Sequence, residues 1–420
     1  MKRRKRPPRT APHTAHLAGA QAACYSSPQQ WRSPEQAAPC GNSTVQVKDE
    51  SAKVAAEAGE LPPAGVLARP DWSRDARPRF TRAPYERPGR RGGRAYAALD
   101  LGTNNCRLLI AEPAHFGFRV VDAFSRIVRL GEGLGRGNRL SEGAIRRTIE
   151  ALRICKDKMD ARAVIKARLI ATEACRLASN GAEFIALVQD ELGLELEVVD
   201  RQTEAYLAVT GCASLADPYA QSVIVFDIGG GSTEIAWLDG VAPKVSADPC
   251  KRIRAWDSLP VGVVTLAERH GGVEVTPQSF EGMIEEVSDL LSNFALIAGP
   301  AASAPYFHLL GTSGTVTTVG GIFLGLPRYD RRRVDGLWMR DSDVSGVIDR
   351  LIDTGFDQRA SNPCIGRDRA DLVLAGCAIL EAIRRAFPSD RLRIADRGLR
   401  EGILMNLMRE DGVWRRRNGA

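Results

Sequence analysis

An apolar stretch that ends on an acid and runs into a glycine-rich turn occurs twice in this chain. Tyr96–Asp100 is followed by Leu101-Gly102-Thr103-Asn104, and Ser222–Asp227 is followed by Ile228-Gly229-Gly230-Gly231-Ser232. A second apolar stretch follows each turn, which is the pattern of strand, tight turn and strand. The copies lie about 130 residues apart, close to the length of a typical domain. The repeat therefore predicts two similar halves with a cleft between them.

Helix and strand patterns alternate along both halves. Ile145, Ile149 and Leu152 recur at helical spacing, whereas Val164–Ala171 is a short apolar run typical of a buried strand. Alternation of this kind predicts a mixed α/β fold.

The net charge of +7 comes from the N-terminal segment. Residues 1–95 hold 18 of the 58 Lys and Arg residues but 8 of the 51 Asp and Glu residues, so the rest of the chain is slightly acidic. Residues 1–94 are rich in Pro, Ala, Ser, Arg and Gly without a sustained period, which predicts a disordered basic extension. Nucleic-acid binding is therefore not expected of the folded body, and the basic tail is its one candidate site.

Several classes of protein are disfavoured by composition. No run approaches the roughly 20 apolar residues that span a bilayer, so we expect no membrane segment. The nine cysteines include no C-x-x-C pair and the five histidines do not cluster, which disfavours a zinc site. The cysteines are typical of small buried residues in a reducing compartment, so we expect a cytoplasmic protein.

The two turns suit the binding of phosphate. Glycines let backbone N–H groups approach an anion, and an acid at a strand end can hold a hydrated magnesium ion. A third loop, Leu310-Gly311-Thr312-Ser313-Gly314, follows another apolar stretch. One such turn alone is more typical of an ordinary hairpin, but two matched turns favour phosphate. None of the three has the spacing of a nucleotide-binding P-loop.

A series of segments in a fixed order carries a resemblance to a known family. The segments are AALDLGTNNCRLLI, RLGEGL, ATEACRLASNGAEF, VVDRQTEAYLAVTG, VIVFDIGGGSTEIAW, LGTSGTVTTV and ADRGLREGIL. Residues 96 to about 410 resemble the exopolyphosphatase/guanosine pentaphosphate phosphohydrolase (Ppx/GppA) family, within the actin, hexokinase and heat-shock ATPase superfamily. The resemblance implies two ribonuclease-H-like domains with mixed five-stranded sheets and an interdomain cleft. We expect them to span 95–220 and 221–394, with about 395–410 packing back on the first.

The resemblance also implies roles for individual residues. Glu204 would be the base that activates the attacking water, and Asp227 and Glu234 would hold Mg²⁺. The phosphate-binding residues would be Asp100, Gly102, Thr103, Asn104, Arg176, Gly229, Gly230, Gly231, Ser232, Gly311, Ser313 and Gly314. Taken without the family, Glu204 could complement a helix dipole.

The sequence allows more than one role for several arginines. Taken alone, Arg176 is more typical of a surface ion pair. Arg129, Arg397 and Arg400 could line the cleft, but solvated helix faces are the favoured positions for them. The chain also departs from the family at Thr203, where a second glutamate often precedes the catalytic segment's alanine. We expect the missing acid to change metal affinity or substrate preference. The further domain of longer relatives needs His-Asp pairs, which this sequence lacks, so we expect a short, two-domain member.

The expected activity is magnesium-dependent release of terminal phosphate from inorganic polyphosphate. Guanosine pentaphosphate (pppGpp) is the alternative substrate, because it has the same terminal phosphoanhydride. An ATP-dependent kinase and a non-catalytic polyphosphate or nucleotide sensor are less favoured, because the sequence retains the presumed hydrolytic acids Glu204, Asp227 and Glu234. A homodimer is possible, since dimers are common in the family.

Overall fold

The computed structural model describes residues 29–30, 94–115, 117–239 and 249–414. Apart from Arg94, all of these residues belong to one compact unit. The predicted disordered extension, residues 1–94, lies outside the described residues except at 29–30 and 94.

The first of two sheets has five strands. They are β2 (Ala95–Leu101), β3 (Asn105–Pro113), β4 (Phe118–Ile127), β5 (Val164–Ala171) and β6 (Glu197–Val198). Their order is β4-β3-β2-β5-β6, and β2 pairs antiparallel with β3 but parallel with β5, so the sheet is mixed. Helices lie on both faces of the sheet, which explains why the central strand β2 is almost continuously apolar.

The second sheet is larger than the five strands expected. Its strands are β1 (Gln29–Gln30), β7 (Ser222–Ile228), β8 (Thr233–Asp239), β9 (Ile253–Leu259), β10 (His308–Thr312), β11 (Trp338–Arg340) and β12 (Arg391–Ala395). Their order is β1-β9-β8-β7-β10-β12-β11. The short strands β1 and β11 add to the two edges of a five-stranded arrangement that matches the first sheet.

The two sheets repeat one topology. In each, three antiparallel strands are followed by a strand that pairs parallel with the first of them: β2-β3-β4 with β5, and β7-β8-β9 with β10. Asp100 near the end of β2 and Asp227 near the end of β7 therefore occupy corresponding positions. The mixed α/β class and the two similar halves are confirmed.

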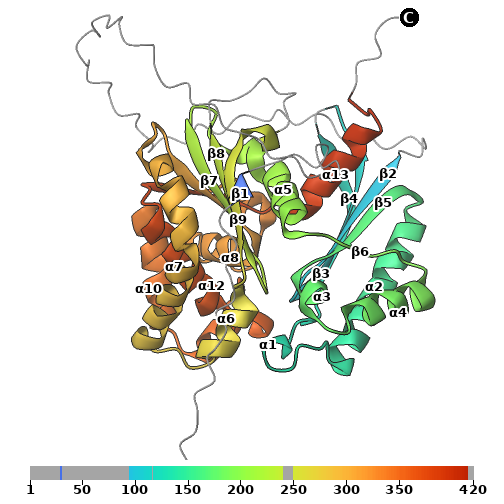
Figure 1. The fold of residues 1–420 in the computed structure, drawn as a ribbon, viewed down its shortest axis with the longest axis horizontal. Helices are drawn as coiled ribbons and strands as arrows, with labels where there is room; N and C mark the ends of the chain where they lie inside the picture. Colours follow the sequence, from blue (N-terminus) through green and yellow to red (C-terminus); the bar gives the residue numbers. More distant parts are fainter. Residues whose placement is uncertain (1–28, 31–93, 116, 240–248, 415–420) are drawn as a thin grey trace, which may run out of the picture. The chain divides into compact units, whose positions relative to one another are not determined.

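One face of the first sheet packs against four helices, which share a core with it. They are α1 (Leu134–Gly137), α2 (Glu142–Ala161), α3 (Glu173–Leu177) and α4 (Gly181–Leu192). Figure 1 shows α2 and α4 beside β2 and β5. The Ser141 side chain caps α2 by accepting a hydrogen bond from the Ala144 N–H at 3.2 Å.

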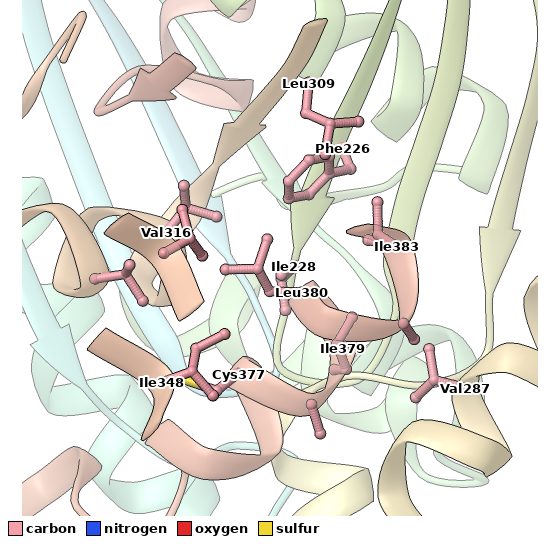
Figure 2. Packing of buried hydrophobic residues seen from close by; sticks show 14 of the residues in the cluster. Phe226, Ile228, Val287, Leu309, Val316, Ile348, Cys377, Ile379, Leu380 and Ile383 are labelled. Atoms are coloured by element: carbon pink, nitrogen blue, oxygen red, sulfur yellow. The ribbon is translucent and has the colours of Figure 1, made fainter. Parts of the chain in front are cut away.

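The second sheet has a helical layer of its own. The elements are α6 (Val263–His270), α7 (Pro277–Ala298), α8 (Ser313–Phe323), α9 (Arg331–Val334), α10 (Asp341–Ile352), α11 (Phe356–Ser361) and α12 (Val373–Ala386). Figure 2 shows part of the core between this layer and the sheet, including Phe226 and Leu309 from strands and Val316 and Leu380 from helices.

Two further helices fill the space between the sheets (Figure 1): α5 (Arg201–Cys212) and α13 (Leu399–Glu410). Helix α5 shares a core with the second sheet, whereas α13 packs on β2, β3 and β5 of the first. The helices touch closely, because a Cβ on Gly211 would lie 1.8 Å from the Gly398 carbonyl oxygen and one on Gly402 would lie 2.0 Å from that of Leu207.

Within the described residues, no helix is long and apolar enough to cross a membrane. All seven cysteines in that part of the chain are buried and free, as their scattered positions predict.

Candidate active site

The two glycine turns have the same internal hydrogen bond. In the first turn the Gly102 N–H donates to the Asn105 carbonyl at 2.9 Å, and in the second the Gly229 N–H donates to the Ser232 carbonyl at 2.9 Å. Each turn reverses the chain within four residues, so that the strand after it pairs with the strand before it. The repeat seen in the sequence is therefore also a repeat of geometry.

The turns contact each other through positions where a side chain would not fit. A Cβ on Gly230 would lie 2.9 Å from Cβ of Thr103, and one on Gly231 would lie 2.7 Å from Thr103 Oγ1. Gly131 of the RLGEGL segment supports the first turn, since its own Cβ would lie 2.2 Å from Cγ2 of Thr103. Its N–H also donates to the Thr103 carbonyl at 2.9 Å. Gly230 and Gly231 therefore allow the backbone of the second turn to lie directly against the Thr103 side chain of the first.

The residue paired with each turn's acid differs between the halves. Asp100 is opposite Arg107 across the β2–β3 hairpin, whereas Asp227 is opposite Glu234 across the β7–β8 hairpin. The first half thus offers a cation at the position where the second offers another carboxylate. Ser232 and Ser258 donate to Glu234 Oε1 through their hydroxyls, at 2.7 and 3.0 Å.

The third loop enters the same region. Thr312 at the end of β10 is in register with Asp227, and α8 begins at the next residue. The backbone φ of Ser313 is 83°, a value that residues other than glycine rarely adopt. The Ser313 Oγ donates to the Ile228 carbonyl at 2.5 Å. The N-terminus of α8, with its partial positive charge, therefore lies beside the turn that follows Asp227.

These loops line a cavity of about 780 Å³ between the halves. The sequence-predicted residues that line it are Asp100, Gly102, Thr103, Asn104, Glu204, Asp227, Gly229, Gly230, Gly231, Ser232, Glu234, Ser313 and Gly314. Thr203, the departure from the family pattern, is not among the lining residues. The position at which relatives often carry the second glutamate therefore does not line the cavity in this chain.

Two predicted phosphate ligands do not line the cavity. Gly311 is buried under Phe226, since a Cβ on Gly311 would lie 2.6 Å from Cζ of the ring, so this glycine serves packing. Arg176 lies behind the wall. Its guanidinium donates to Glu173, to Glu204 and to the Val199 carbonyl, which does not fit the predicted phosphate contact.

Glu204 faces the cavity from the first turn of α5. The Asp200 side chain caps this helix by accepting from the Thr203 N–H at 2.7 Å, which fixes where the helix starts. Arg176 Nη2 donates to Glu204 Oε2 at 2.7 Å. Burial, followed by the nearby charge of Glu234, raises the pKa of Glu204 well above its usual range, although Arg176 opposes the shift.

The other central carboxylates also hold protons more tightly than usual. Burial, followed by the charges of Asp100 and Glu204, raises the pKa of Asp227 to about 7. Burial and the charge of Asp227 raise the pKa of Glu234 to about 7. Burial raises the pKa of Asp100 too, against the opposing charge of Arg107. The cavity floor therefore has more negative charge than its surroundings stabilise.

This excess of carboxylate suits a divalent cation. Among the described residues, no group of three or more His, Cys, Asp or Glu side chains has the geometry of a complete metal site. Magnesium does not require one, because it keeps several waters and binds through one or two carboxylates together with substrate phosphates. Asp227 and Glu234, paired across one hairpin and each with a raised pKa, fit that donor set.

The sequence analysis did not place most of the arginines that line the cavity. The lining includes Arg107, Arg126, Arg331, Arg369, Arg397 and Arg400, of which Arg397 and Arg400 had been assigned to solvated helix faces. Arg107 could have been found, because the turn places it directly opposite Asp100. Arg331 and Arg369 come from short segments of the second half that have no distinctive pattern. Arg129 lies outside this cavity and pairs with Asp371 at 3.0 Å.

Two of these cations converge at Gly314. The position of a Cβ on Gly314 is 3.6 Å from Arg369 Nη1 and 3.9 Å from Arg107 Nη2. Within the described part of the chain neither arginine forms a salt bridge with a carboxylate, and Arg369 donates to the carbonyls of Ile365 and Cys364. Burial, followed by the charge of Arg107, lowers the pKa of Arg369. Like charges held together in this way favour an anion between them.

Comparison with known proteins identifies the family. Residues 109–411 match the Ppx/GppA phosphatase family. The chain belongs to this family. Because the Ppx/GppA family is one of phosphatases, the resemblance and the hydrolase class expected from the sequence are confirmed.

Solved structures agree with the Ppx/GppA assignment. The Ppx/GppA family member from Aquifex aeolicus is 28% identical with a TM-score of 0.61, covering 76% of this chain and 99% of its own. An exopolyphosphatase-like protein is 26% identical with a TM-score of 0.64, covering 75% and 99%. An exopolyphosphatase from Cytophaga hutchinsonii shares the fold at 21% identity, with a TM-score of 0.67 and coverage of 76% and 98%.

Proposed function

We propose that this phosphatase is an exopolyphosphatase, which releases the terminal phosphate of inorganic polyphosphate with Glu204 as the general base. The observation that carries the proposal is the convergence of Arg107 and Arg369, from opposite halves, at the N-terminus of α8, where neither forms a salt bridge within the described residues. A chain of phosphates has an anion at every unit, and it can occupy the two glycine turns and the arginines at the same time.

The lining also disfavours recognition of a base. Among the described residues that line the cavity, Tyr329 is the one aromatic, and its hydroxyl already donates to Asp396 Oδ2 at 2.7 Å. Polyphosphate has no base to stack, so it requires no aromatic platform. The alternative substrate pppGpp carries the same terminal phosphoanhydride, and a cavity of about 780 Å³ has room for a small-molecule ligand.

The terminal phosphate would bind to the two glycine turns. Within the described part of the chain, the N–H groups of Gly230 and Gly231 donate no hydrogen bond, so they are free to bind phosphate oxygens. Arg107 and Arg369 would neutralise charge on the phosphates. Asp227 and Glu234 would hold Mg²⁺, which supplies further charge neutralisation and alignment of the phosphates.

The reaction is a displacement at the terminal phosphorus. Glu204 accepts a proton from the attacking water as the bond between water oxygen and phosphorus forms. The bond from that phosphorus to the bridging oxygen breaks, and its electron pair leaves with the shortened polyphosphate. A carboxylate with a raised pKa is suited to this task, because a general base works best when its pKa lies close to the pH of the reaction.

Release of phosphate by the full chain in magnesium, measured side by side on long-chain polyphosphate and on pppGpp, tests the substrate. We expect the larger kcat/KM on polyphosphate. A larger value on pppGpp would replace the proposed substrate with the nucleotide. Phosphate appearing only on an added acceptor in the presence of ATP would indicate a kinase instead, and binding without release from either substrate would indicate a sensor.

A further inference from the structure

Four charged residues on two helices alternate in sign, with Glu204 at the cavity wall and the other three behind it. Helix α3 contributes Glu173 and Arg176, and α5 contributes Arg201 and Glu204. In each helix the two residues are three positions apart, so they lie on one face. The helices follow the parallel neighbours β5 and β6, which brings both N-terminal turns to the same edge of the first sheet.

Three ion pairs join the four side chains into one continuous chain. Arg176 Nη2 lies 2.7 Å from Glu204 Oε2 and 2.7 Å from Glu173 Oε2, and Arg176 Nε lies 2.9 Å from the same oxygen of Glu173. The other oxygen of Glu173 accepts from Arg201 Nη2 at 2.7 Å. Arg176 Nη1 donates to the Val199 carbonyl at 2.6 Å. All three guanidinium nitrogens of Arg176 are thus engaged by the protein.

Burial makes these contacts strong constraints. The side chain of Glu173 is 2% exposed, that of Glu204 11% and that of Arg176 15%, whereas that of Arg201 is 41% exposed. A buried ion pair that loses one member leaves an unpaired charge away from water, so the pairs resist separation. Arg176 would have to give up such a pair in order to bind a phosphate.

Glu204 is held on one side only. Arg176 binds its Oε2, while its Oε1 makes no hydrogen bond to any described residue. Glu204 lines the cavity, but Arg176 and Glu173 do not. Carboxylates that face the same region from other elements are Glu234 of β8, Asp100 of β2 and Asp227 of β7. They repel the Glu204 carboxylate, so a fixed cation behind it is needed to hold it in place.

We propose that Arg176 is a positioning residue for the hydrolytic reaction, holding Glu204 Oε2 from behind so that Oε1 faces the attacking water. Glu173 holds Arg176 in turn, and Arg201 holds Glu173. This inference rests on the proposed role of Glu204 as the base. Substrate phosphates are bound by other residues, and Arg176 does not touch them.

The two roles of Arg176 predict different kinetics. A positioning residue acts on the chemical step, so its loss lowers kcat and leaves KM for polyphosphate little changed. A phosphate ligand contributes to substrate binding, so its loss raises KM. Glu173 separates the roles further. Glu173 is a carboxylate that does not line the cavity, so its replacement affects turnover only if its ion pair with Arg176 helps to hold Glu204.

The experiment measures kcat and KM for phosphate release from long-chain polyphosphate, using the full chain. The variants are Arg176→Gln, Arg176→Lys, Glu173→Gln and the double variant Arg176→Gln/Glu173→Gln. We expect kcat to fall about 100-fold in Arg176→Gln, as misplacement of a catalytic group does, with a smaller fall in Glu173→Gln. Arg176→Lys should recover part of the loss, because an ammonium can still bind Glu204. The effects should be non-additive, because the residues act through one contact chain.

Arg168→Ala is the matched control. Arg168 lies on β5 of the same half and pairs with the exposed Glu197 at 2.8 Å, so its loss should change neither constant. A raised KM with unchanged kcat in Arg176→Gln, or a Glu173→Gln variant that turns over as wild type does, would overturn the inference. Thermal melts identify a variant that fails to fold, and the remaining variants then decide.

The same series distinguishes failure of this inference from failure of the proposed function. A wild-type chain that releases no phosphate from polyphosphate but does so from pppGpp would overturn the substrate proposal. The variants would then be compared on pppGpp with the same expectations. A wild-type chain active on polyphosphate whose Arg176 variants change KM alone would overturn only the positioning role.

Discussion

Asp227 lies directly opposite Glu234 across the β7–β8 hairpin, and both line the cavity, Glu234 buried and Asp227 half-buried. Loss of solvation and the charges of neighbouring cavity carboxylates disfavour both as anions, and the pKa of each is raised to about 7. In the first hairpin Arg107 is opposite Asp100, and its positive charge opposes the rise in the pKa of that carboxyl. This difference in charge is why we assign the proposed Mg²⁺ to Asp227 and Glu234 of the second hairpin.

Stability of the cation-free protein should fall as the pH rises from about 4 to about 7. A carboxyl whose pKa is higher in the folded state binds its proton more tightly there, so its stabilising effect is present below the unfolded pKa of about 4. That effect is lost as the pH rises through about 7, where Asp227 and Glu234 ionise. We expect Asp227→Asn to have a higher Tm than wild type at pH 8 without divalent cations, and the difference to shrink at pH 5.

Thermal melts with and without magnesium test the same relationship. Magnesium should raise the Tm of wild type by a few degrees or more at pH 8 and by less at pH 5, because ligand binding stabilises the folded state. It should raise the Tm of Asp227→Asn less than that of wild type. A magnesium effect of equal size in both proteins would show that the cation does not bind at Asp227.

Arg400 should contribute to substrate binding, and Arg409 of the same helix should not. Arg400 lines the cavity and forms no ion pair within the described residues, whereas Arg409 is exposed and donates to Asn406 at 3.2 Å. We expect Arg400→Ala to lower kcat/KM on polyphosphate about tenfold or more, the scale of one lost charge-assisted contact. Arg409→Ala is the control, and an equal loss in both variants would indicate a general effect of charge.

The close crossing of α5 and α13 should not tolerate a side chain. A Cβ on Gly211 would lie 1.8 Å from the Gly398 carbonyl oxygen, so Gly211→Ala must push the helices apart. We expect a loss of about 1–3 kcal/mol in the free energy of unfolding, measured with urea. Gly346→Ala in α10 is the control, because nothing lies within 4 Å of its Cβ position. It should gain about 0.5–1 kcal/mol from helix propensity.

The parts of the site that could be predicted from sequence are those whose spacing is local. Asp100 and Asp227 each precede a turn that closes within four residues, so strand, acid and turn are fixed by neighbouring positions. Glu204 was assigned through the family resemblance, and the structure places it at the cavity. Its role as base stays a prediction. The edge strand β11 was missed because three residues carry too little periodicity to be recognised.

The parts that could not be predicted depend on contacts between distant segments. Arg369 reaches Arg107 only because the two halves pack together, and no local pattern records that approach. Gly311 has the sequence context of a phosphate loop, but the Phe226 ring occupies the space beside it. Arg176 was assigned to substrate, yet Glu173, three residues earlier on the same short helix, engages its guanidinium. A local sequence motif identifies which residue is present, but it does not show which other residue that side chain contacts in the folded protein.

The most direct test of the account is the turnover of long-chain polyphosphate by Glu204→Gln in the full chain with magnesium. Glutamine keeps the size of the side chain and can still accept from Arg176, but it cannot take a proton from water. We predict that kcat falls about 10²–10⁴-fold while KM changes little, as expected for loss of a general base. A Glu204→Gln protein that releases phosphate as fast as wild type would contradict the assignment of Glu204 and the mechanism built on it.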